Sequence, residues 1–255
     1  MLFYLLFLPI AGLSLAWSMI YGSEQLLWST LFFTFLYSGY GISVGFHRLH
    51  SHKTFKTWEP LRKFLLYLGC QGAQGSPVTW SLIHNRSHHA KTDTENDVHT
   101  PTKGKWYAFF GWIFHRENHE FARKELFKIR AQLDPFALWC HKNYVLLIIL
   151  NLVLITLFTV WWHDGRYILA SLNASFLSVV ISGIVNVFGH TPIPMLTYQT
   201  DPMKNNSTNN PWLVFLTWGE SLHNNHHYRP RRLNFNTKWY ELDVGRWMIS
   251  AIKKS

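Results

Sequence analysis

The sequence predicts an all-helical integral membrane protein with four transmembrane helices in two hairpins and a cytosolic helical cap that carries clustered histidines. Three observations support this fold class: four long uncharged stretches, a one-sided distribution of basic residues, and four histidine clusters beside those stretches. We expect one domain over residues 1–255. Its expected transmembrane helices are at about 1–22, 25–46, 144–162 and 167–190, and its expected cytosolic segments are at about 47–143 and 191–255.

The four uncharged stretches are long enough to cross a bilayer. They are Met1–Ser23, Gln25–Phe46, Asn143–Trp162 and Tyr167–Thr200. A membrane-spanning helix needs about 20 apolar residues, and uncharged runs of this length are unusual for the buried helices of a soluble protein. The first stretch lacks the basic flank and the small-residue cleavage site of a signal peptide, so we interpret it as a retained helix.

The basic residues set the expected orientation. Of 24 Lys and Arg residues, 15 fall between Phe46 and Lys142, 8 follow Thr200, and only Arg166 lies elsewhere. Because cytoplasmic segments carry the excess of Lys and Arg, both basic segments and both chain termini are expected in the cytosol. The net charge of +10 is mostly this topology signal. Nucleic-acid binding is not expected, since the basic residues are spread between spans rather than gathered in a motif.

The segments between the spans contain further helix and loop signals. Leu61–Leu68 is apolar but too short to span, which favours an interfacial or re-entrant segment. Glycines and a proline interrupt Gly69–Pro77, so irregular backbone is expected there, with helix resuming near Trp80. Asp201–Pro211 is polar and rich in Asn, which is typical of a loop.

Nine histidines fall into four clusters, each beside an apolar stretch or in a basic segment. They are His47, His52, His84, His88, His89, His190, His223, His226 and His227. Imidazole is the commonest metal ligand in proteins, and one tetrahedral ion takes about four ligands. Nine imidazoles therefore indicate two metal ions close together. No carboxylate lies within the clusters, unlike in the carboxylate-bridged iron sites of soluble bundles.

Helical spacing suggests which histidines share an ion. Residues three or four apart lie on one face of an α-helix, which would pair His84 with His88 and place the last three histidines on one face. His47 and His52 are five residues apart, so on an ideal α-helix they diverge and could serve different ions.

The order of these motifs carries a resemblance to a known family. The segments GISVGFHRLHSH, HNRSHH, DTENDVH, NVFGH and WGESLHNNHH, in that order, are similar to those of the membrane fatty acid desaturases, in particular the acyl-CoA Δ9 (stearoyl-CoA-like) branch. The resemblance covers nearly the whole chain. It implies two iron ions held by the nine histidines, with Asn186, one helical turn before His190, holding a water near one iron. It also implies that Gln74 and Trp80 line the acyl tunnel.

The implied reaction introduces a cis double bond, Δ9, into a saturated acyl chain carried by coenzyme A or a lipid. Oxygen would be the oxidant, and the electrons would come from a separate donor protein, a cytochrome b5 or a ferredoxin. Oxidation of an unactivated C–H bond needs a cofactor, because amino-acid side chains cannot perform it unaided. The membrane would be a bacterial inner membrane or the endoplasmic reticulum.

One motif departs from the family pattern. The second cluster is usually HxxHH, whereas HNRSHH has one more residue between the first histidine and the pair. We assign His84 as the ligand. His50 is expected to be a spectator and His99 to hydrogen-bond a ligand. The neighbouring acids of the DTENDVH segment are either such partners or solvated loop residues.

Two other functions are compatible with clustered histidines. A histidine-box lipid hydroxylase shares the first hydrogen abstraction with a desaturase, so the clusters alone do not separate the two; the DTENDVH and GESLHNNHH segments favour the desaturase. A metal transporter is less favoured. Transporters place their ligands near the bilayer midplane, whereas these clusters are expected at the cytosolic rim.

Overall fold

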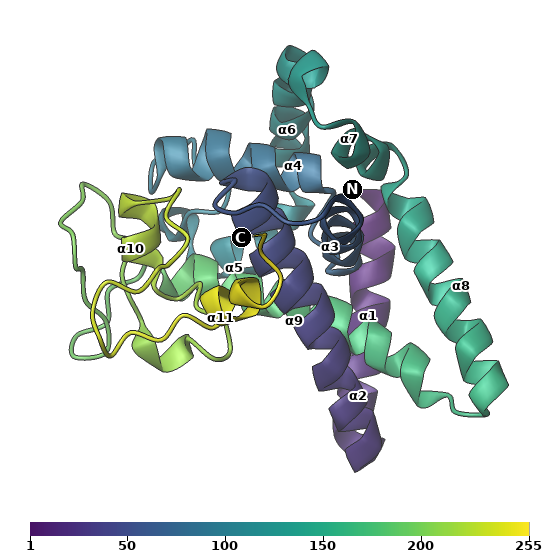
Figure 1. Cartoon of the computed structure of the whole chain (residues 1–255). Helices are drawn as coiled ribbons and strands as arrows, with labels where there is room; N and C mark the ends of the chain where they lie inside the picture. The colour runs from purple at the N-terminus through teal and green to yellow at the C-terminus, as the bar shows by residue number, and fades with distance from the viewer. Residues whose placement is uncertain (255) are drawn as a thin grey trace.

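The computed structural model describes residues 1–254, and this part of the chain is helical apart from loops and two isolated β-bridges. Three helices are long and apolar enough to cross a membrane: α1 (Leu2–Tyr21), α8 (Tyr144–Trp162) and α9 (Arg166–Phe188) (Figure 1). Their bounds lie within two residues of the predicted spans, because long uncharged runs end at the first charged or turn-forming residues.

The remaining predicted span, 25–46, is the second in chain order. It is not the single α-helix that we expected. It is divided between α2 (Glu24–Thr34), which Ser23 caps by accepting a hydrogen bond from the Leu26 amide, and η1 (Phe35–Ser51), a π-helix that continues directly from it. A π-helix has i→i+5 hydrogen bonds and is rare beyond a single turn. The structure therefore offers three uninterrupted α-helices of spanning length, not four.

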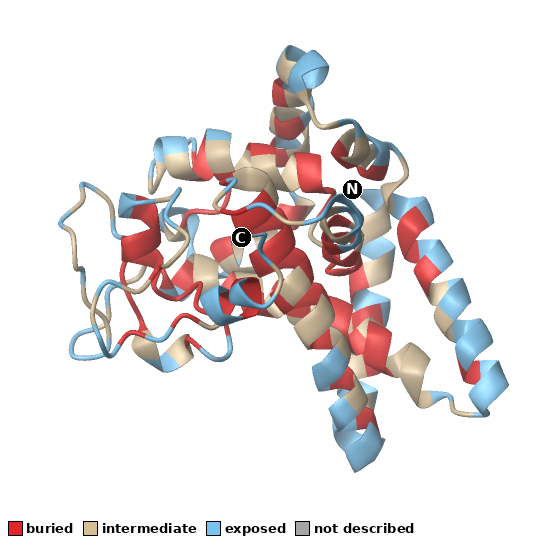
Figure 2. Cartoon of the chain, viewed as in Figure 1, coloured by how far each residue is buried: buried red, intermediate tan, exposed pale blue. Residues whose placement is uncertain are grey.

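The long helices expose much of their apolar surface. In α1 and α8 most residues are exposed (Figure 2). Leu13, Met19, Leu154 and Trp161 are each at least 61% exposed. Helix α9 is about half buried and packs against α1, α2, α5 and α8. Contiguous apolar surface of this extent suits lipid rather than water. The helices therefore associate with a membrane.

The shorter helices gather on the side of the molecule away from the α8–α9 turn (Figure 1). They are α3 (Glu59–Gln71), α4 (Pro77–Leu82), the π-helix η2 (Ile83–His89), α5 (Lys105–Phe109), α6 (Arg116–Ile129), α7 (Pro135–Lys142), α10 (His223–Tyr228) and α11 (Val244–Ser250). Short 3-10 turns at 101–103, 111–114, 130–132 and 211–213 connect them.

The structure gives the backbone of these segments. Leu61–Leu68 lies inside α3, whose buried face packs along η1, and its predicted interfacial or re-entrant position stays a prediction. Residues 69–71, predicted to be irregular, belong to the same helix. Helix resumes at Pro77, where Ser76 and Thr79 form a reciprocal capping box, so the irregular backbone is limited to residues 72–76. Residues 201–211 form a loop, with one bridge at Asn209.

The packing of η1 on α3 depends on a glycine. A Cβ atom at Gly41 would lie 2.5 Å from the Gly69 amide nitrogen and 2.6 Å from the Leu68 carbonyl carbon. These neighbours are backbone atoms, so they cannot turn aside as a flexible side chain would. This close approach fixes the position of η1 against α3, and with it the position of His47 near the end of η1.

Replacing Gly41 with alanine should therefore lower the free energy of unfolding by about 1–3 kcal/mol, the usual cost of overpacking. Thermal unfolding of the purified protein would measure the loss. Gly111→Ala is the matched control, because a Cβ there would meet nothing closer than 3.6 Å. Equal midpoints for the two variants would contradict the proposed close contact.

Candidate metal centre

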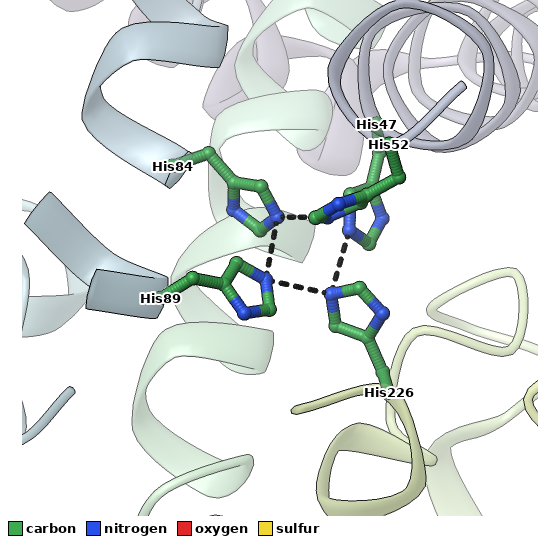
Figure 3. A group of neighbouring side chains, drawn as sticks. All are labelled: His47, His52, His84, His89 and His226. Atoms are coloured by element: carbon green, nitrogen blue, oxygen red, sulfur yellow. Dashed lines mark hydrogen bonds between the residues drawn. The ribbon is translucent and has the colours of Figure 1, made fainter. Parts of the chain in front are cut away.

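The structure collects the nine clustered histidines into two buried groups. In each group the ring nitrogens lie within 4.8 Å of one another. Group A, drawn in Figure 3, consists of His47, His52, His84, His89 and His226. Group B consists of His88, His190, His223 and His227. Segments up to 180 residues apart in the chain thus meet at one place, as the two-metal interpretation requires.

The π-helices explain the membership of group A. Because π-helical residues five apart are one turn apart, His47 and His52 lie on the same side of η1. The His52 amide donates to the His47 carbonyl at 3.1 Å, the i→i+5 bond of this geometry. The expectation that these two diverge and serve different ions is wrong, since both belong to group A.

The same geometry accounts for the extra residue in the second cluster. In η2, His84 joins its i+5 neighbour His89 in group A, with their Nε2 atoms 3.0 Å apart. His88, which α-helical spacing predicted to share an ion with His84, points into group B instead. The longer HNRSHH motif is therefore accommodated by a π-turn, and His84 lies among the other histidines.

Helix α10 contributes to both groups. His223 and His227 are one α-helical turn apart and belong to group B, whereas His226 faces group A. The prediction that all three lie on a single face is therefore wrong. Both η2 and α10 therefore contribute histidines to group A and to group B, so the two groups lie side by side.

The distances between ring nitrogens match those of a shared ion. Nε2 atoms of contacting rings are 2.8–3.0 Å apart in group A and 3.0–3.5 Å apart in group B. With metal–nitrogen bonds of roughly 2.0–2.1 Å, two ligands of one ion lie roughly 2.9–3.4 Å apart for bond angles between square and tetrahedral. The donor set fits one ion in each group.

Carboxylates fix the orientation of three rings. His47 Nδ1 lies 2.6 Å from a Glu220 oxygen, and His88 Nδ1 lies 3.1 Å from Asp97. His190 Nδ1 lies 3.2 Å from Asp93. With Nδ1–H donated to these acceptors, the Nε2 lone pairs of these rings face the other histidines of their group, an arrangement that a bound metal cation would stabilise.

Burial lowers the pKa of most of these rings. Desolvation is the main cause and the neighbouring rings add to it. The affected residues are His52, His84, His88, His89, His223, His226 and His227. At neutral pH these imidazoles are therefore uncharged, which is the form that binds metal.

Sequence reasoning missed Glu220, although it lies within the quoted GESLHNNHH segment. Besides its contact with His47, it accepts hydrogen bonds from Ser43 Oγ and from Nε of the buried Arg48, at 3.3 Å for the arginine. Arg48 also pairs with Asp243, at 2.8 Å. Burial alone would raise the pKa of Glu220, but His47 and Arg48 outweigh it, so the carboxylate is ionised.

The structure also places the acids of the DTENDVH segment and the histidines outside the two groups. Of the three acids left open, Asp93 and Asp97 contact ligand-position histidines, and Glu95 is exposed. His99 does not hydrogen-bond a histidine of either group; its ring packs on His88 with centroids 4.4 Å apart. His50 belongs to neither group, as predicted.

A cavity lies against both groups. His47 and His84 of group A and His88 and His223 of group B form part of its wall. Its other lining residues include the three predicted from resemblance: Gln74, Trp80 and Asn186. The cavity places any molecule inside it against both groups of histidines at once.

Hydrogen bonds hold all three of these cavity residues. Gln74 donates to the Ser178 carbonyl at 2.8 Å and accepts from Ser182 and from the Trp80 indole. The Trp80 ring stacks on His84, with centroids 4.6 Å apart. Asn186 lies in α9 and donates to the Ala108 carbonyl at 3.1 Å. Contacts within the protein thus orient these side chains in the cavity wall.

An all-helical fold with three helices of membrane-spanning length and two buried histidine groups defines a membrane-associated protein with a metal-centre donor set. A model of the fatty acid desaturase family matches residues 2–251. The chain therefore belongs to the fatty acid desaturase family, and it is an oxidoreductase of that family. This confirms the resemblance inferred from the histidine motifs.

Three relatives illustrate the range of that similarity. A hex-5-enoyl-[acyl-carrier protein] acetylenase of Moorena producens is 33% identical over 84% of this chain and 70% of its own length. An sn-1 stearoyl-lipid 9-desaturase of Anabaena variabilis is 33% identical over 82% and 74%. A probable acyl-CoA desaturase of Schizosaccharomyces pombe is 32% identical over 88% and 47%.

Proposed function

We propose that the protein is an oxygen-dependent fatty acyl desaturase that introduces a cis double bond, Δ9, into a saturated acyl chain. The observation that carries this proposal is the cavity whose wall contains histidines of both groups. An acyl chain in this cavity would present its methylenes to the two groups together. The relatives' names share an acyl substrate and differ in its carrier, which is an acyl-carrier protein, a lipid or coenzyme A; we propose coenzyme A or a lipid as the carrier here.

The histidines would hold two iron ions, one in each group. Group A supplies five imidazoles and group B four, so group B has room for a further ligand. Asn186, one turn before His190 and on the cavity wall, is placed to hold a water there. Bound iron would supply the oxygen chemistry that removes two hydrogens from unactivated carbons.

The protein's own residues determine which bond reacts. Trp80 is fixed between Gln74 and His84, so its indole limits where an acyl chain can lie. Orientation of this kind decides which methylene pair faces the metal centre. The buried carboxylates Glu220, Asp97 and Asp93 keep the rings pointed inward and offset the positive charge of the site.

We further propose that the chain crosses the membrane four times, with α2 and η1 forming the second crossing. The direct continuation of α2 into η1 and the lack of charge over 25–46 support this. Both termini and the histidine-bearing segments would then face the cytosol, where the basic residues concentrate. A separate electron donor, a cytochrome b5 or a ferredoxin, would reach the site from that side.

Expression in a host that lacks its own desaturase tests the proposal. We expect new cis-monounsaturated fatty acids, and analysis of derivatised fatty acids by mass spectrometry would locate the double bond at carbon 9. Host carrying the empty vector is the control. A well-expressed, iron-loaded protein that forms only hydroxylated acyl chains, or no product from any acyl carrier supplied, would contradict the proposal.

A further inference from the structure

A large basic depression lies outside the cavity that faces both histidine groups. Its volume is ≈ 900 Å³, against ≈ 80 Å³ for that cavity. Six basic side chains line it: Lys53, Lys56, Arg62, Arg86, Arg231 and Lys254. We call it the basic depression.

Four of the six basic side chains of the depression make no ion pair with residues 1–254. Arg62 pairs with Asp134, the one acidic residue in the lining, at 3.1 Å and with Glu59 at 2.7 Å, and Arg86 lies 3.8 Å from Glu125. Lys56 and Arg231 are exposed, and neither makes an ion pair with any residue from 1 to 254. A concave surface of one charge sign focuses its field and attracts partners of the opposite sign.

The basic depression reaches the metal centre. His52 and His89 of group A are part of its lining. His89 is half-buried, whereas the other eight clustered histidines are fully buried, and His52 has the highest exposure of those eight, at 8%. A partner seated here would therefore lie against the imidazole edges of group A.

The depression and the cavity share no lining residue. Of group A, the cavity is lined by His47 and His84, and the depression by His52 and His89. An electron carrier needs only to approach the metal ligands and does not have to enter the cavity, so a redox partner suits the depression.

The proposed reaction requires such a partner. Converting a –CH2–CH2– unit to –CH=CH– releases two electrons and two protons, whereas reducing one O2 to two waters consumes four of each. An external carrier must therefore supply two electrons, and the solvent supplies the remaining two protons. Delivered singly, these electrons need a docking surface that is close to group A and is separate from the acyl chain.

Resting on the proposed function, we propose that the basic depression is the docking surface for an acidic one-electron carrier protein, which would deliver electrons past His52 and His89 to the iron ion that group A would hold. Complementary charge would steer the carrier into the depression and fix its orientation. The contact would be transient, as suits a carrier that must dock and leave twice in each turnover.

Charge reversal at Lys56 and Arg231 tests the inference in the full-length, metal-loaded protein in lipid nanodiscs. The probes are the soluble haem domain of a cytochrome b5 and a plant-type ferredoxin. For the probe that binds the wild type, we expect Lys56→Glu with Arg231→Glu to raise Kd by about tenfold or more and to weaken its dependence on salt. Calorimetric titration measures this without any turnover.

The matched control is Lys105→Glu with Lys124→Glu, which reverses two exposed charges outside the depression. This pair should leave Kd within about twofold of the wild-type value, since screened charges at a distance contribute little. Metal content is measured in parallel for all variants, and it should match that of the wild type.

Turnover assays separate the inference from the proposed function. The depression variant should show a raised KM for the carrier protein, an unchanged KM for the acyl substrate, and unchanged turnover with dithionite as a small reductant. Unaltered carrier binding, or a raised KM for the acyl substrate alone, would overturn the docking surface and leave desaturation intact. Altered binding in a protein that forms no unsaturated product would support the surface and overturn the function instead.

Discussion

Replacing His226 with alanine should remove the metal of group A and reduce desaturation to background. The Nε2 atom of His226 lies 2.9 Å from those of both His47 and His89. Removing the ring deletes one ligand and breaks the contact between His47 of η1 and His89 of η2. Because the proposed reaction uses two ions, loss of either should abolish the product.

The neighbouring residue provides a comparison within the same helical turn. His227→Ala should remove the metal of group B and leave that of group A, since His227 contacts His88 and His223 at 3.0 and 3.1 Å. Metal analysis should give about half of the wild-type iron for each variant, and spectroscopy of the remaining ion should differ between them. His115→Ala, an exposed histidine outside both groups, is the control.

Identical remaining iron spectra in the two variants would contradict the division into groups A and B. Full retention of iron in either variant would contradict its role as a ligand. Both readouts are independent of activity, so they test the two-site arrangement even in a preparation without an electron donor.

The sequence predicts which histidines form the site better than it predicts which of them lie in the same group. Nine histidines in four motifs mark the metal centre, because imidazoles rarely recur so closely for any other reason. Their division into groups could not be predicted, since it depends on π-helical backbone at η1 and η2. Five-residue spacing places His47 with His52 only when the backbone gains an extra residue per turn.

The fold shows the same contrast. The bounds of α1, α8 and α9 follow from uncharged runs, which the chemistry of the bilayer dictates. The 25–46 stretch is equally free of charge, yet it contains three glycines, two of which pack closely on α3, and it changes from α- to π-helix. Glu220 was overlooked for a related reason, because its partners, His47 and Arg48, lie over 170 residues away in the chain.

Glu220→Gln should show whether Glu220 orients the His47 ring or only stabilises the fold. The substitution keeps the shape of the side chain but removes the charge that accepts from His47 and faces Arg48. Loss of a partner of this kind typically lowers metal affinity or activity about 10–100-fold. We expect that loss at group A, measured as a higher metal dissociation constant and a lower kcat. The weakened pair with Arg48 should also lower the free energy of unfolding by roughly a few kcal/mol.

Asp243→Asn is the matched control. Asp243 pairs with the same arginine, at 2.8 Å, and caps α11 by accepting from the Arg246 amide, but none of its hydrogen bonds or ion pairs involves a histidine of either group. It should destabilise the protein to a similar extent while leaving the metal affinity of group A near the wild-type value. Equal losses of metal affinity in the two variants would show that Glu220 acts only through the fold. A loss confined to Glu220→Gln would identify this carboxylate as the residue that holds His47 in its ligand orientation.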